Sequence, residues 1–239
     1  MIRIGTSGWR YPEWRDGFYR GIPQRRWLGH LAEHVGTIEI NSSFYHPQPP
    51  SNYRKWVAET PPDFTFAVKG PKLITHVKRL RNAEEPLKAF VESLALGPKQ
   101  GPAIWQLPPT LRFDRAVLTD FLAALPPGRH AVEPRHESFR DDAYFDLLHA
   151  HNVAHVVSDA PTFPRIEAVT ADFAYARLHG HDELYISSYD DRQLDEWARK
   201  IRDWDRDTYV YFDNTMKGAA PYNALALAQR LGTPIRSHM

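Results

Sequence analysis

The sequence predicts an α/β fold, a single-domain (β/α)8 barrel of the TIM type, over residues 1–239. Eight short apolar segments recur along the chain, and amphipathic stretches of helical periodicity lie between most of them. The length of 239 residues is close to the roughly 250 residues of one such barrel. No linker, low-complexity block or internal repeat divides the chain, so we expect one domain.

The expected strands are the eight apolar segments, and nearly all of them end in a polar or charged residue followed by a loop. In chain order they are Arg3–Ser7, Thr37–Asn41, Phe64–Lys69, Ala103–Gln106, His130–Glu133, His155–Asp159, Ala174–His179 and Tyr209–Asn214. Barrels of this type build their sites at the carboxyl ends of their strands, so these polar ends are where we expect the function.

The expected helices show apolar residues at spacings of three and four. Phe113–Leu125 carries one clear stripe, and Arg192–Trp204 carries another, with Asp190 or Asp191 as its N-cap. The other expected helices are Arg26–His34, Ser51–Glu59, Pro86–Leu96, Asp141–Ala150 and Ala219–Leu231. Ala160–Asp172 has no clear helical stripe and is the weakest unit of the predicted barrel.

The loops after the strands are longer than the loops after the helices. Short helix-to-strand links contain turn residues such as Gly36 and Gly128. The long strand-to-helix links are Gly8–Arg25, Ser42–Pro50, Gly70–Glu85 and Gly180–Asp191. In a barrel the long links share one rim with the strand carboxyl ends, which indicates a built binding site there.

Composition excludes several classes of site. The chain has no cysteine, which excludes disulfides, iron–sulfur ligation, thiolate zinc sites and a cysteine nucleophile. A formal net charge of +1 neither demands nor excludes a nucleic-acid partner. No apolar run approaches the roughly 18 residues of a membrane span, so we expect no membrane partner. The first strand starts at about residue 2, so we expect no signal peptide and a cytoplasmic protein.

Two short motif matches do not support a cofactor site. The turn at Gly5–Gly8 is not followed by a dinucleotide or phosphate-loop motif, so we expect no nucleotide cofactor. His30–His34 fits the H-x-x-E-H pattern of certain zinc proteases, but it lies on a predicted outer helix with a buried stripe of its own. Any other cofactor stays unknown, and a divalent metal stays open.

Charged and polar residues gather at the expected strand ends, and alternation along a strand puts pairs such as Glu39 and Asn41 on one face. Carboxylates and imidazoles are the usual proton-transfer groups. The candidate catalytic residues are Glu133, Asp159, Glu39, His179 and His136. The candidate substrate-binding residues are Lys69, Arg135, Arg177, Asn41, Trp9, Tyr45, Gln106, His76, Asp213 and Asn214. Among these, Lys69, Arg135 and Arg177 are the expected clamp for an anionic group.

Two other interpretations of these residues stay open. Burying many charges at one rim is costly unless they pair, so the set also fits a structural salt-bridge network such as Arg135–Glu133. Glu133, Asp159 and His179 come from successive strands and supply ligand types suited to a metal. No tight ligand spacing is present at the rim, so the metal ligands stay unknown.

Several strings in the sequence resemble the YecE-like family, known as the domain of unknown function 72. They run in order over essentially the whole chain: Gly5–Trp9, Tyr11–Trp14, Glu39–Tyr45, Phe66–Lys69 with Ile74–His76, Trp105–Pro109, Val132–His136, Arg177–Gly180 and Tyr211–Asn214. The resemblance implies a TIM-barrel fold and supplies no activity. Two positions depart from the family pattern: Asp213 stands where Asn is expected, and Phe139 stands where Trp is expected.

Three functions fit these residues. The first is an enzyme with carboxylate acid–base residues, a hydrolase, isomerase or lyase, acting on a small phosphorylated or polyhydroxylated substrate. The second is a metal-assisted phosphodiesterase acting on nucleic acid. The third is a non-catalytic barrel that binds a metabolite. The fold alone does not choose among them, and the sequence is silent on the oligomeric state.

Overall fold

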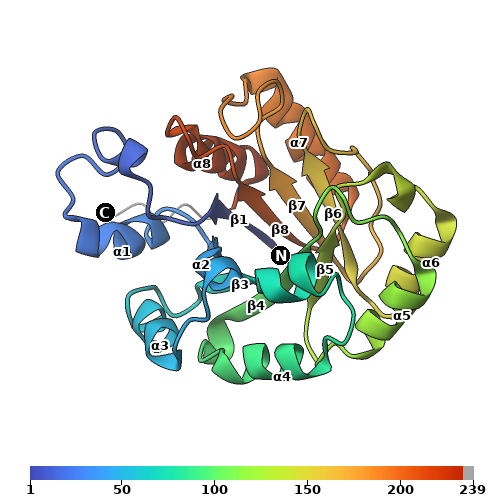
Figure 1. Cartoon of the computed structure of the whole chain (residues 1–239). Helices are drawn as coiled ribbons and strands as arrows, with labels where there is room; N and C mark the ends of the chain where they lie inside the picture. Colours follow the sequence, from blue (N-terminus) through green and yellow to red (C-terminus); the bar gives the residue numbers. More distant parts are fainter. Residues whose placement is uncertain (234–239) are drawn as a thin grey trace.

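A closed barrel of eight parallel strands forms the centre of the computed structural model, which describes residues 1–233. The strands follow one another around the barrel in chain order, and β8 pairs with β1 to close it (Figure 1). They are β1 Ile2–Ser7, β2 Thr37–Ile40, β3 Thr65–Lys69, β4 Gln100–Gln106, β5 His130–Glu133, β6 Ala154–Asp159, β7 Phe173–Leu178 and β8 Asp207–Phe212. The predicted (β/α)8 fold is confirmed, and each strand overlaps its predicted segment.

Helices cover the outside of the barrel, and each helix expected from the sequence is present (Figure 1). They are α1 Trp27–Ala32, α3 Pro50–Ala58, α4 Glu84–Ser93, α5 Arg115–Ala123, α6 Asp142–Ala150, α7 Asp191–Asp203 and α8 Ala219–Leu231, and a short helix that was not expected, α2 Ser42–Tyr45, lies in the loop after β2. The side chain of Asp190 accepts from the backbone of Gln193 at the start of α7, as its predicted capping role requires. Residues 160–172, the weakest predicted unit, form no helix between β6 and β7.

The rim loops hold short elements that the sequence did not reveal. Besides α2, they are η1 Pro12–Trp14, η2 Gln24–Arg26, η3 Leu73–Val77 and η5 Glu137–Phe139, while η4 Gly97–Lys99 precedes β4. Elements of three to five residues are too short to show a periodic stripe.

None of the helices within residues 1–233 combines the length and the hydrophobicity that a membrane span requires.

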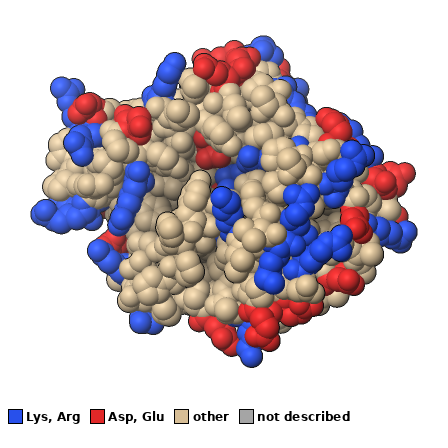
Figure 2. All heavy atoms as spheres, in the orientation of Figure 1, with Lys and Arg blue, Asp and Glu red and all other residues tan. Residues whose placement is uncertain are grey.

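Aromatic and small side chains fill the barrel beneath its mouth. Tyr175, Tyr211 and Phe173 are fully buried there, next to alanines such as Ala131. Because side chains alternate along a strand, the next inward positions towards the carboxyl end belong to polar residues. In this way Tyr175 is followed by Arg177, Tyr211 by Asp213 and Ala131 by Glu133. The aromatic layer is thus the floor of the barrel mouth, the polar region at the carboxyl ends of the strands. Figure 2 shows acidic and basic side chains side by side in the hollow at the centre of this face.

Candidate active site

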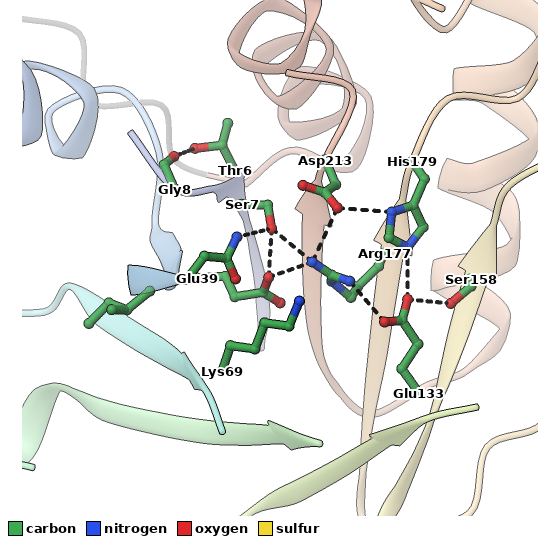
Figure 3. Close-up of polar contacts among 12 residues, drawn as sticks. Thr6, Ser7, Gly8, Glu39, Lys69, Glu133, Ser158, Arg177, His179 and Asp213 are labelled. Carbon is green, nitrogen blue, oxygen red and sulfur yellow. Dashed lines mark hydrogen bonds and ion pairs between the residues drawn. The ribbon is translucent and has the colours of Figure 1, made fainter. Parts of the chain in front are cut away.

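Arg177, on β7, lies at the centre of the mouth and joins three carboxylates from three other strands (Figure 3). Its Nη1 donates to Glu133 Oε2 at 2.9 Å. Its Nη2 lies 2.8 Å from Glu39 Oε1, 3.2 Å from Asp213 Oδ2 and 3.0 Å from Ser7 Oγ. The side chain is 1% exposed. Both amino groups of Arg177 are therefore occupied by protein acceptors, and their donors are not free to form the predicted anion clamp.

His179, two residues further along, lies between two of these carboxylates (Figure 3). Its Nε2 forms a hydrogen bond with Glu133 Oε1 at 2.7 Å. Its Nδ1 lies 2.9 Å from Asp213 Oδ2, an ion-pair distance that is not aligned as a hydrogen bond. Ser158 Oγ donates to the same oxygen of Glu133 at 3.0 Å. An imidazole can accept a proton at one ring nitrogen and release one at the other. The Glu133–His179–Asp213 chain can therefore carry a proton across the mouth.

The carboxyl groups of Glu133 and Asp213 stay ionised because of the charged residues around them. Burial by itself raises the pKa of Glu133, but Arg135 and Arg177 outweigh burial and hold this pKa well below its usual range. Burial also raises the pKa of Asp213, but Arg177 and His179 outweigh it and lower this pKa to about 2. At neutral pH both groups are therefore ionised.

Glu39 is held by donors on both of its oxygens. Ser7 Oγ donates to Oε1 at 2.6 Å, and the hydroxyl of Tyr175 donates to Oε2 at 2.6 Å from the layer below. Burial and the charge of Glu39 raise the pKa of Tyr175 well above its usual value, so the phenol stays protonated and keeps donating. The predicted catalytic residue Glu39 is placed in the mouth, where it fixes Arg177.

Lys69 ends β3 and is 9% exposed. Its Nζ lies 4.2 Å from the centre of the Phe44 ring, and within residues 1–233 it has no hydrogen-bond acceptor or ion-pair partner. Burial, followed by the charge of Arg177, lowers its pKa to about 8. His76 packs against the same ring at 5.0 Å, and burial together with Lys69 lowers its pKa to about 4.

Arg135 reaches the mouth from the loop after β5. Its Nη2 lies 3.3 Å from Glu133 Oε2, its Nη1 donates to the hydroxyl of Tyr185 at 3.3 Å, and its guanidinium stacks 4.0 Å from the centre of the Phe163 ring. Its Nε has no hydrogen-bond partner among the described residues. Unlike Arg177, this side chain remains 10% exposed, so it keeps donor capacity at the surface of the mouth.

A cavity of about 440 Å³ adjoins the mouth on the side of β1 and β2. It is lined by Gly8, Trp9, Arg10, Tyr11, Asn41, Ser42, Gln48, Asn52, Lys55 and Trp56. Asn41 Nδ2 donates to Ser7 Oγ at 2.9 Å, which connects the cavity to the Arg177 network, while Asn41 Oδ1 is buried without a partner in the described chain. Trp9 packs edge-on against Trp56, whereas Tyr45 lies 66% exposed on the rim.

Asp159 is not part of this set, although the sequence placed it at the inward end of its strand. It faces the outer layer, where it contacts His181 Nδ1 at 3.1 Å and Trp197 Nε1 at 3.4 Å. Ser158 takes the inward position instead and binds Glu133. Every residue of β6 is buried, so no alternation between apolar and polar residues marks which face points inward. Asp159 therefore lies outside the Arg177 network.

Three further predicted residues lie at the strand ends without contacting the network. Gln106 donates to the backbone of the next residue, and His136 accepts from a backbone N–H at the start of η5. Asn214 donates to Asn223 on α8, behind the barrel wall. The sequence interpretation also missed Ser7, Ser158 and Tyr175, since a hydroxyl in a strand is an ordinary residue until its partners are known.

The three residues whose types suit a metal, Glu133, Asp159 and His179, do not come together in one place. Glu133 and His179 are in contact, but Asp159 lies on the other side of β6. In the described part of the chain, no group of three or more His, Cys, Asp or Glu residues is arranged to hold a metal ion.

Comparisons of sequence agree with the order of motifs along the chain. A family described as protein of unknown function DUF72 matches residues 3–238. The UPF0759 protein YecE of Escherichia coli (strain K12) is 27% identical over 240 residues, covering 88% of this chain and 85% of the relative. The UPF0759 protein YunF of Bacillus subtilis (strain 168) is 25% identical over 278 residues, covering 97% and 95%.

Comparisons of structure agree with the barrel. The crystal structure of a DUF72 family protein from Thermotoga maritima MSB8 matches with a TM-score of 0.87 and 27% identity, covering 97% of this chain and 99% of the other. One from Enterococcus faecalis V583 matches with a TM-score of 0.83 and 20% identity, covering 97% and 96%, which supports the shared fold alone.

Proposed function

This chain belongs to the DUF72 family of unknown function, and we propose that it is an enzyme that transfers protons on a small phosphorylated or polyhydroxylated substrate at the barrel mouth. The observation that carries the proposal is the Glu133–His179–Asp213 chain, in which one imidazole lies within 2.9 Å of two buried carboxylates. General acid–base catalysis needs a proton acceptor and a donor fixed in this way.

Each group of the mouth has a role in this proposal. Glu133, ionised at neutral pH, accepts a proton from the substrate, and His179 carries a proton between Glu133 and Asp213. Lys69 and Arg135 contact an anionic group or a sugar oxygen, because each keeps donor capacity at the mouth. The cavity beside Trp9 and Asn41 receives the rest of the substrate.

Polar atoms without partners support a ligand site over a purely structural network. Nearly all buried polar atoms in proteins have hydrogen-bond partners. Among the described residues, four such atoms that belong to or adjoin the mouth have none: Asn41 Oδ1, Arg135 Nε, Arg177 Nε and His179 Nδ1, which makes only an ion-pair contact with Asp213. A salt-bridge network that served stability alone would have no need of such atoms.

The experiment is a turnover screen that does not require the reaction to be known. The protein is incubated in D2O with triose, pentose and hexose phosphates and sugar acids, and proton NMR follows deuterium uptake at carbon and any new product. We expect at least one compound to change with the wild-type protein. Glu133→Gln, which removes the proton acceptor but keeps the shape, should slow that change by about 10²-fold or more.

Asp207→Asn is the matched control, because this carboxylate lies at the opposite end of the barrel, 2.8 Å from Arg129 Nη2. It should turn over the same compound at the wild-type rate. Equal rates for wild type and Glu133→Gln would refute the proposed role of Glu133. Thermal stabilisation by a compound of the panel with no turnover of any of them would instead favour the non-catalytic, metabolite-binding barrel.

A further inference from the structure

Two lysines are buried among residues 1–233, and of these two only Lys99 has hydrogen-bond acceptors within that part of the chain. Lys99 is 6% exposed, and its Nζ donates to the backbone oxygens of Val57 and Thr60, each at 2.7 Å, and to the Thr60 hydroxyl at 3.1 Å. Lys69 is 9% exposed, and its Nζ has an aromatic face but no acceptor within residues 1–233. The three acceptors make Lys99 a structural residue, whereas Lys69 is left available for a ligand.

We propose that the Lys69 amine is a nucleophile that forms an imine with the carbonyl group of an aldose or ketose phosphate at the barrel mouth. This inference rests on the proposed function and narrows its substrate to compounds with a free aldehyde or ketone. The geometry that supports it is a strand-end amine that points towards the carboxylates of the mouth, as Figure 3 shows. The Phe44 ring lies 4.2 Å from its Nζ.

The chemistry balances with the groups present. The nitrogen lone pair of neutral Lys69 adds to the carbonyl carbon, and one nitrogen proton passes to the carbonyl oxygen to give a carbinolamine. A second proton, from solvent or from the Glu133–His179 pair, lets the hydroxyl leave as water while nitrogen and carbon form the double bond. The sum is amine, carbonyl and one proton giving a cationic iminium and water. Glu39 and Glu133 are the anions that face this cation.

The surroundings keep part of Lys69 neutral near neutral pH. Burial and the positive charge of Arg177 lower its pKa to about 8, and a lysine beside another cation in a desolvated site is an activated nucleophile. The titratable and charged groups that act on Lys69 from the surrounding elements are Arg177, Glu133, Glu39, Arg135, Asp213 and His76. The rate of imine formation should therefore rise with pH, with a midpoint of about 8.

The test is reductive trapping with dihydroxyacetone phosphate and cyanoborohydride at pH 8, followed by intact mass and peptide mapping. We expect one adduct per chain, at Lys69. At that pH a lysine of pKa about 8 is half neutral and an ordinary exposed lysine is almost wholly charged, so Lys69 should react about 10 to 100 times faster than the others. Lys69→Arg should lose the adduct, and Lys99→Arg should keep it.

Adducts spread over exposed lysines such as Lys72 and Lys88, with none favoured at Lys69, would overturn the inference. Mapping of the wild-type protein decides this even if Lys69→Arg fails to fold. Two combinations separate this inference from the proposed function. Failure of trapping with a large loss of turnover in Glu133→Gln overturns only the role of Lys69. Trapping at Lys69 with equal turnover in Glu133→Gln keeps the nucleophile and overturns the acid–base role.

Discussion

The buried guanidinium of Arg177 connects the charged residues of the mouth. Arg177 is 1% exposed and meets Glu39, Glu133 and Asp213, which come from or follow β2, β5 and β8. Removing one partner from such a network leaves an uncompensated buried charge, which typically costs about 3–5 kcal/mol. The ionisation of each carboxylate therefore depends on its neighbours, and this dependence is measurable as a change of stability with pH.

Asp213→Asn should remove part of the acid sensitivity of folding. Asp213 has its pKa lowered from 3.8 to about 2, so its carboxylate stabilises the fold fully above pH 4, and this stabilisation is lost as the pH falls from about 4 to about 2. The shift corresponds to about 2 kcal/mol. In urea unfolding, the free-energy gap between wild type and variant should be large at pH 6 and should narrow by about this amount near pH 2.5.

Asp146→Asn is the control, since Asp146 is exposed on α6. It should leave the dependence of stability on pH as it is in the wild type. A gap between wild type and Asp213→Asn that stays constant from pH 6 to pH 2.5 would show that Asp213 does not titrate as described.

The strands position these residues. Side chains alternate between the two faces of a strand, so the face on which a residue falls decides whether its side chain enters the mouth. On β7 the sequence analysis named Arg177, and after β8 it named Asp213 and Asn214 without choosing between them. In the structure the side chains of Arg177 and Asp213 meet inside the barrel. On β6 it chose Asp159, while the structure places Ser158 inside. Strands of a parallel barrel are buried on both faces, so the sequence marks where such a strand ends but not which face its last residue takes.

The cap of α7 is an element whose stability is predictable from the sequence. Asp190 accepts from the backbone of Gln193, and the side chain of Gln193 accepts from the backbone of Asp190 in return. Asp190→Ala should lower the free energy of unfolding by about 1 kcal/mol, because an N–H of the first turn loses its acceptor. Asp190→Asn, which keeps a side-chain oxygen, should lose only a fraction of that. Equal losses in the two variants would show that the cap does not stabilise α7.

The fold of the whole molecule was predictable because the sequence patterns that indicate it are local and recur along the chain. Eight apolar segments, helical stripes and long links on one rim are enough to predict the barrel and the end that holds the mouth. The convergence of Ser7, Glu39, Glu133 and Asp213 on Arg177 is a property of barrel closure, since these residues lie 36 to 170 positions away from Arg177 in the chain. No local pattern in the sequence encodes such distances.

The central claim is that the mouth transfers protons, and the turnover of His179→Gln per folded molecule tests it most directly. A glutamine amide can still donate towards Glu133 but cannot carry a proton from one carboxylate to the other. With the compound found in the D2O screen, and at a temperature where circular dichroism shows the variant folded, we expect turnover to fall by about 10²-fold or more. Turnover equal to that of the wild type would mean that the Glu133–His179–Asp213 chain only stabilises the barrel.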